Sequence, residues 1–308
     1  MNAPFPIDPV LTAIAIAYRN KTYIADDVLP RVPVAKQEFK YRKFPKADAF
    51  TIPNTFVGRT SRPNQVEFGF TEAADFTRAY GLDDPIPHAD VANAPEGHDP
   101  AAHAAETLSN IIATDREARV AGLVFDPNQY DTANKATLTG TDQWSDFDNS
   151  NPIADILGAL DKCIMRPNIM VLGNAVWTQL RQHPKIAKAT HGNSGDVAVV
   201  ARQAVAELLE LEAIFVGQAF VNTAKRGQEV SVERAWGKHV ALIYRDTLAN
   251  TQSGTTFGFT AQWGDRIAGT IPDPNLGLEG GTVVRVGENV KELITANDLG
   301  YFFQDAVA

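Results

Sequence analysis

Apolar residues near the start of the chain follow a helical period. Asp8 and Pro9 form a typical helix start, because aspartate caps the first turn and proline fits its geometry. We predict that the buried face of this helix carries Val10, Leu11, Ile14 and Ala17. Prolines at positions 30 and 33 then disfavour regular structure. Residues 23–34 are therefore predicted to form an extended arm that lies on another surface.

Residues 37–86 alternate short polar and aromatic stretches, and their helical periodicity is weak. Phe39, Tyr41 and Lys43 would share one side of a strand, while prolines interrupt the rest of the segment. This pattern predicts a long hairpin-like excursion with little core of its own. Because long segments without a core are uncommon inside compact domains, we expect this one to pack on a partner.

The clearest helical pattern begins at Asp99, has Pro100 as its first helical residue and continues to Val124. An unbroken helix of that length would span roughly 40 Å at about 1.5 Å per residue. Leu108 and Ile112 are predicted to face the core of the subunit. The polar face is predicted to remain available to another subunit, and it carries Glu106, Asp115, Arg116, Glu117 and Arg119.

From residue 151 the pattern changes to alternating helices and strands. Helices are predicted over residues 151–163, 174–182 and 196–209, and strands over residues 168–172 and 213–216. The following strands are predicted over residues 240–244, 255–259, 281–286 and 290–296, separated by glycine, asparagine and proline turns. This order of elements indicates an α+β protein.

Composition and charge refine this picture. With 44% hydrophobic and 21% charged residues, the chain can bury a large core. The formal net charge is -9, yet the first 62 residues carry 10 basic and 5 acidic side chains, so the positive charge is concentrated there. We expect this segment to meet an acidic neighbouring subunit or nucleic acid. The candidate residues for contacts between subunits are Lys40, Arg42, Lys43, Lys46, Glu106 and Arg116.

Few residues point to catalysis or metal binding. Cys163 is the single cysteine, which excludes an intrachain disulfide and a thiolate cluster. The six histidines form no metal-binding or catalytic motif, so we predict no catalytic residue, no cofactor and no metal site. One alternative stays open, because the Asp/Asn-rich residues 142–151 form either a loop that caps the next helix or the site of a hydrolase. The apolar run at residues 10–17 is shorter than the roughly 20 residues that span a bilayer, so we expect no membrane segment.

Several short motifs occur in the order arm, loop, long helix and α/β region. They are YIADDVLPRVPV at residues 23–34, YGLDDPIP at 80–87, ANA at 92–94, REARVA at 116–121 and NIMVLG at 168–173. With this order, nearly the whole chain resembles the major capsid proteins of tailed bacteriophages, which have the Hong Kong 97 type fold.

The resemblance implies five parts in chain order. They are an N-terminal arm at residues 1–36, an extended loop at 37–86, a peripheral domain with a long spine helix at 87–150, an axial domain at 151–250, and strands at 251–308 that return to the peripheral domain. It also implies a structural protein rather than an enzyme. Its pentamers and hexamers would self-assemble into an icosahedral shell that encloses double-stranded DNA without sequence-specific binding.

The expected partners are further copies of the chain, a scaffolding protein, a portal and a decoration protein. The expected location is the virion capsid, after assembly in the cytoplasm of the bacterial host. Some relatives carry an N-terminal scaffolding segment that a protease removes, and no such helical extension precedes the arm here, so a separate scaffold or a segment already cleaved is implied. The alternative function within the same fold is an encapsulin-like compartment that encloses cargo enzymes.

Overall fold

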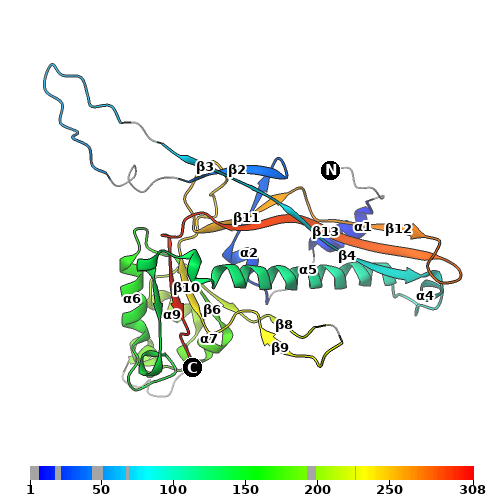
Figure 1. Cartoon of the computed structure of the whole chain (residues 1–308). Coiled ribbons are helices and arrows are strands. Elements are labelled where there is room, and N and C mark those ends of the chain that lie inside the picture. Colours follow the sequence, from blue (N-terminus) through cyan, green and yellow to red (C-terminus); the bar gives the residue numbers. More distant parts are fainter. Residues whose placement is uncertain (1–6, 18–21, 44–50, 67–68, 193–198, 226) are drawn as a thin grey trace.

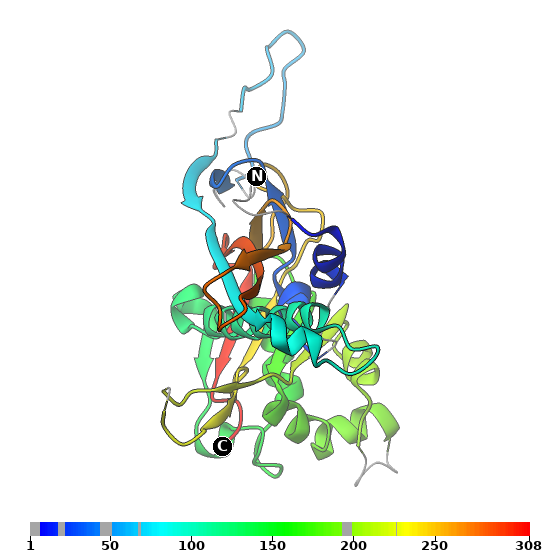
Figure 2. The same cartoon turned by 90° about the vertical axis from the view of Figure 1, so that its right-hand side faces the viewer.

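The computed structural model describes residues 7–17, 22–43, 51–66, 69–192, 199–225 and 227–308. Helix α5 (Pro100–Val124) crosses the middle of the molecule and underlies a long sheet, and these two elements form the spine body (Figure 1). A second, α/β body lies below one end of α5, and a long loop projects on the opposite side. Figure 2 shows that this loop rises clear of both bodies.

The sheet of the spine body is built around one central strand. β13 pairs antiparallel with three strands, and the arm strand β1 pairs parallel with β11 at the far edge. The strands are β1 (Arg31–Val34), β4 (Arg78–Pro87), β11 (Gly258–Trp263), β12 (Ile267–Asp273) and β13 (Gly281–Ile294). Helix α1 (Pro9–Ala17) and α5 pack on this sheet, and the short helix α4 (His88–Ala92) joins β4 to α5.

The prediction of two strands between residues 281 and 296 is wrong, because β13 is continuous through Gly287, Glu288 and Asn289. These three residues resemble a turn in the sequence, but Gly287 lies opposite Gly81 of β4 in the ladder. A Cβ atom at Gly287 would lie 3.0 Å from the Tyr80 carbonyl oxygen. Glycine therefore permits a close approach of two strands here rather than a reversal of the chain.

Helix α5 agrees with its prediction at both ends. The Asp99 carboxylate caps it by accepting hydrogen bonds from the backbone N–H groups of Ala101 and Ala102, at 2.9 and 3.3 Å. Leu108 and Ile112 are buried against the sheet, as predicted. The first helix faces differently from its prediction: Leu11 and Ala15 are buried, whereas Val10 is 67% exposed.

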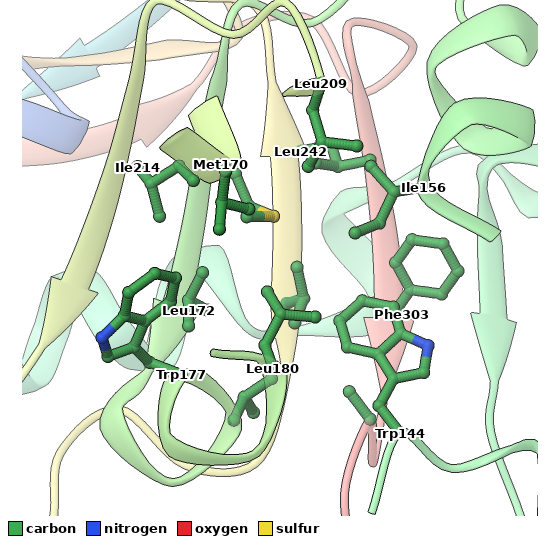
Figure 3. Packing of buried hydrophobic residues seen from close by; sticks show 14 of the residues in the cluster. Trp144, Ile156, Met170, Leu172, Trp177, Leu180, Leu209, Ile214, Leu242 and Phe303 are labelled. Carbon is green, nitrogen blue, oxygen red and sulfur yellow. The ribbon is translucent and has the colours of Figure 1, made fainter. Parts of the chain in front are cut away.

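The α/β body contains a five-stranded sheet in the order β5-β14-β10-β6-β7. The strands are β5 (Lys135–Thr137), β6 (Ile169–Gly173), β7 (Ala213–Gly217), β10 (Val240–Ile243) and β14 (Gly300–Gln304). One face is covered by α6 (Pro152–Lys162), α7 (Asn174–Leu180), α8 (Pro184–His191) and α9 (Arg202–Leu208). Figure 3 shows this core, in which Met170 and Leu172 of β6 meet Leu180 and Ile156 from the helices.

The opposite face of this sheet joins the two bodies. Ile169 and Val171 alternate with the residues that face the helices, and they pack with Val124 and Phe125 at the end of α5. The arm contributes Val28 and Leu29 to the same cluster. The prediction that residues 23–34 are extended throughout is wrong, because helix α2 (Ala25–Val28) precedes strand β1.

Two antiparallel hairpins complete the fold, formed by β2 (Glu38–Lys43) with β3 (Thr71–Phe76) and by β8 (Phe220–Asn222) with β9 (Val232–Arg234). Short 3-10 turns are η1 (Pro127–Gln129), η2 (Thr132–Asn134) and η3 (Gly140–Asp142). The sequence did not predict α8, β8, β9, β12 or β14. The helix expected over residues 196–209 begins at Arg202, and its first three positions lie outside the described residues. The strand expected over residues 255–259 runs from Gly258 to Trp263.

Candidate assembly surfaces

The loop between β2 and β3 presents apolar side chains that its own subunit leaves uncovered. Ile52 is 91% exposed and Phe56 is 82% exposed. The stem is anchored, because Phe39 and Tyr41 are buried and the Tyr41 ring meets Phe259 edge-on with 6.4 Å between centroids. A rigid stem that carries an exposed apolar tip is typical of a surface that another molecule covers.

The excursion is shorter than the sequence predicted. Residues 78–86 were assigned to the loop, but they belong to β4 and pair along β13. Ile86 is buried in the core beneath the sheet. The alternation in this segment therefore reflects a strand of the spine body, and the projecting part lies between β2 and β3.

The basic residues of the stem have different surroundings. Lys40 forms an ion pair with Glu72 across the hairpin, with 2.9 Å between Nζ and Oε2. Arg42 lies 4.1 Å from the centroid of the Phe70 ring, and Lys43 lies 5.7 Å from that of Tyr41. All three residues are exposed. Lys46 lies outside the described residues.

The two candidates on α5 differ sharply in exposure. Glu106 is exposed in the first half of the helix, as predicted. The prediction that Arg116 faces outward is wrong, because only 2% of it is exposed. Its guanidinium pairs with Asp26 of the arm, donates to the Thr260 hydroxyl at 3.0 Å, and has Nε 3.7 Å from a Glu292 oxygen. The arm and the sheet cover this half of the helix, so its charges bind within the subunit.

An ion-pair network extends from Arg116 along the arm. Asp26 also accepts a hydrogen bond from Arg31 Nε at 2.7 Å, and Arg31 reaches the buried Glu288 at 2.8 Å. Burial raises the pKa of Asp26, but Arg116 and Arg31 outweigh that effect and lower the pKa to about 2. Burial likewise opposes ionisation of Glu288, and Arg31 and Arg266 hold its pKa below the usual value. The carboxylates therefore stay charged and hold the arm on the spine body.

Glu117 is the neighbouring residue that sequence reasoning also placed outside. It is fully buried, and its carboxylate accepts hydrogen bonds from the backbone N–H groups of Ile24 and Ala25, both at 2.9 Å. It also accepts one from Trp236 Nε1 at 2.7 Å. A Cβ atom on Gly217 would lie 2.0 Å from the Trp236 ring, so glycine there makes room for the indole. Burial raises the pKa of Glu117 despite these donors. One side chain thus joins α5, the arm and the α/β body.

The acidic side chain of Asp146 forms hydrogen bonds within the Asp/Asn-rich loop itself. The Asp146 carboxylate accepts hydrogen bonds from the backbone N–H groups of Asp148 and Asn149, and the Asn151 side chain makes no cap hydrogen bond to α6. Asn151 is the N-cap residue of α6, in agreement with the predicted start of this helix, but its side chain does not provide the cap.

The same loop contains the pair of Ser150 and His183, with 3.0 Å between Oγ and Nε2. His183 Nδ1 accepts a hydrogen bond from the Lys185 backbone N–H, so in the neutral ring Nε2 carries the proton and donates it to Ser150. The Ser150 hydroxyl in turn donates to the Asp146 carbonyl at 2.6 Å. Burial, and to a lesser extent Lys185, lower the pKa of His183 to about 4. These proton positions oppose activation of the serine as a nucleophile.

Among the residues with described positions, no group of three or more His, Cys, Asp or Glu side chains could hold a metal ion. The helices in those parts of the chain are too short or too polar to cross a membrane.

Comparisons with known proteins point to one class. A family model described as phage major capsid protein E matches residues 102–260. The chain is 60% identical over 307 residues to the major capsid protein of Pseudomonas phage JBD67, with 100% of this chain and 99% of that protein covered. A solved phage-related protein from Bordetella bronchiseptica RB50 is 25% identical with a TM-score of 0.76, over 99% of this chain and 98% of that one. The capsid structure of cyanophage P-SCSP1u gives a TM-score of 0.60 at 10% identity, over 92% of this chain and 88% of that one.

Proposed function

The chain belongs to the phage major capsid protein E family, and on that premise we propose that it is the structural subunit of an icosahedral phage head. Its fold is the Hong Kong 97 type, in agreement with the sequence resemblance. The observation that carries the proposal is the 60% identity, over the full length, to a phage major capsid protein. The exposed apolar loop supports it, since such a loop needs a neighbouring molecule to cover it.

We assign a role to each part of the chain on the same basis. Residues 1–36 form the arm, 37–86 the extended loop with its return strand, and 87–150 the peripheral domain with the spine helix. Residues 151–250 form the axial domain. Of residues 251–308, strands β11, β12 and β13 return to the peripheral domain, whereas β14 pairs with β10 and β5 in the α/β body. In this assignment the spine body is peripheral and the α/β body surrounds the symmetry axis of a pentamer or hexamer.

The proposed shell encloses double-stranded DNA, and its subunits assemble in the bacterial cytoplasm with a scaffolding protein, a portal and a decoration protein. The protein has a structural role and needs no cofactor. The basic stem of the loop supports contacts with other copies, because Arg42 and Lys43 are exposed and the remainder of the chain is strongly acidic.

Electron microscopy of the purified chain, expressed alone and with its scaffolding protein, tests the proposal directly. We expect rings, tubes or closed shells far larger than 33.4 kDa. A chain that remains monomeric at all concentrations and salt conditions, even with scaffold present, would overturn the proposal. Particles that package a cargo enzyme instead of DNA during infection would favour the encapsulin-like compartment.

A further inference from the structure

The β8–β9 hairpin presents an uncovered apolar face. Phe220 and Val232 lie on the same side of the two strands, by the pairing of Phe220 with Arg234 and of Asn222 with Val232. Phe220 is 52% exposed, Val232 is 57% exposed and Val230, next to the strand, is 69% exposed. Arg234 completes this face, with its guanidinium 4.6 Å from the centroid of the Phe220 ring. We call these four residues the hairpin face.

A two-stranded hairpin is at best marginally stable in water without a packing surface. In Figure 1, β8 and β9 extend away from the α/β body beneath α5. Figure 2, from the side, shows the same hairpin standing out from the body. Strand β8 contacts α5 of its own subunit, whereas the hairpin face stays exposed. An apolar surface with a carboxylate at its edge would match the chemistry of this face.

Helix α6 provides a surface of that kind. Ala154, Leu157, Gly158 and Asp161 recur at helical spacing, and all four are exposed. Leu157 is 42% exposed, and the position of a Cβ atom at Gly158 faces open space. The adjacent Lys162 has its Nζ 5.5 Å from the centroid of the Tyr301 ring, and Asp161 is exposed. We call these four residues the α6 face.

The two faces lie on opposite sides of the α/β sheet. Helix α6 packs on one side through Ile156 and Leu160. The hairpin leaves from the other side, where Ala219 before it and Trp236 after it belong to the core shared with α5. Two complementary surfaces on opposite sides of one subunit cannot satisfy each other within that subunit. They can do so head to tail between copies, and a head-to-tail contact closes into a ring when the rotation permits.

We propose that the hairpin face of each subunit packs on the α6 face of the next subunit around a ring. Phe220, Val230 and Val232 cover Leu157 and the flat surface at Ala154 and Gly158, while Arg234 approaches Asp161. The positive charge of Arg234 complements the negative charge of Asp161. When the partner is a second copy of the chain, every subunit in the ring has both its hairpin face and its α6 face covered. The proposal rests on the assembly of rings and shells proposed above, and it identifies one contact within them.

Chemical cross-linking of assembled particles tests this contact. Val232→Cys and Leu157→Cys would be combined in one chain, and the particles treated with a short bis-maleimide that tolerates an imprecise register. Native Cys163 is buried, and burial, with a smaller contribution from Asp298, raises its thiol pKa to about 11, so it reacts slowly. We expect a covalent ladder on denaturing gels that extends to pentamers and hexamers.

The single variants and their mixture serve as controls. Each single variant should remain monomeric on the gel, whereas particles co-assembled from the two singles should give dimers and no longer products. Particles of normal shape that give no cross-link in the double variant or in the mixture would overturn the proposed contact and leave the capsid function intact. Dimers from Val232→Cys alone would mean that hairpins meet each other, which also overturns it. Failure of the wild-type chain to assemble would instead count against the capsid function itself.

Discussion

Removal of the Glu117 carboxylate should destabilise the subunit strongly. Glu117→Ala leaves three buried donors without an acceptor, namely the Ile24 and Ala25 amides and the Trp236 indole. Each buried unsatisfied donor costs about 1 to 3 kcal/mol, although water can enter the space left by the side chain and such losses do not add fully. We therefore expect a loss of about 3 to 5 kcal/mol from the free energy of unfolding, a large share of the roughly 5 to 15 kcal/mol typical of folded proteins.

Glu106→Ala is the matched control, since it removes an exposed carboxylate from the same helix and should change stability by at most about 0.5 kcal/mol. Glu117→Gln keeps one acceptor oxygen but turns an amide N–H group toward other donors, so an intermediate loss is expected. Urea unfolding of unassembled subunits, followed by tryptophan fluorescence, measures the stability. Hydrogen exchange at the Ile24 and Ala25 amides should accelerate in both Glu117 variants. Equal urea midpoints for Glu117→Ala and Glu106→Ala would refute the reasoning.

Three further predictions follow from the packing and the charges. Leu108→Ala should cost about 2 to 5 kcal/mol in urea unfolding, because it leaves a cavity under the sheet, and a change below that range would mean that the site collapses. Arg42→Glu with Lys43→Glu should leave the melting temperature nearly unchanged and reduce closed particles in micrographs, whereas a normal yield would exclude these residues from the contacts. Because the pKa of Asp26 is lowered to about 2, its contribution to stability is present above its ordinary value of 3.8 and is lost as the pH falls through 2. Asp26→Asn should therefore flatten the loss of stability between pH 4 and pH 2, and an unchanged slope would contradict that role.

Elements with local signals were predictable from the sequence. The Asp99 cap and the spacing of Leu108 and Ile112 identify α5 because helix formation depends on neighbours one turn apart. The continuous apolar run at residues 169–172 identifies β6, because a strand that is buried on both faces is apolar at every position. The central strand β13 failed this test, because its glycine is required by the distant Gly81 and not by a local turn.

The burial of charges on α5 could not be read from the sequence. Arg116 and Glu117 have the composition of a solvated helix face, and their surroundings are set by residues far along the chain, Asp26 in the arm and Trp236 in the α/β body. The signal that could have revealed Arg116 is its spacing of four residues from both Ile112 and Val120, which places it on the buried side of α5. The exposure of Arg42 was predictable, because alternation with the buried Phe39 and Tyr41 places it on the opposite side of β2. Lys43 shares the side of Phe39 and Tyr41, and it is exposed at the end of the strand.

Strand β14 has a consequence for the timing of synthesis. It is an inner strand, paired with β10 on one edge and with β5 on the other. The sequence separation between β5 and β14 exceeds half the length of the chain, so β5 is synthesised long before β14. On a translating ribosome, β5 has no described partner strand and β10 keeps an open edge until residue 304 has left the exit tunnel. A nascent chain that has not reached this point cannot present a closed α/β body to a growing shell. The order of strands thus delays closure of the α/β sheet until β14 has been synthesised.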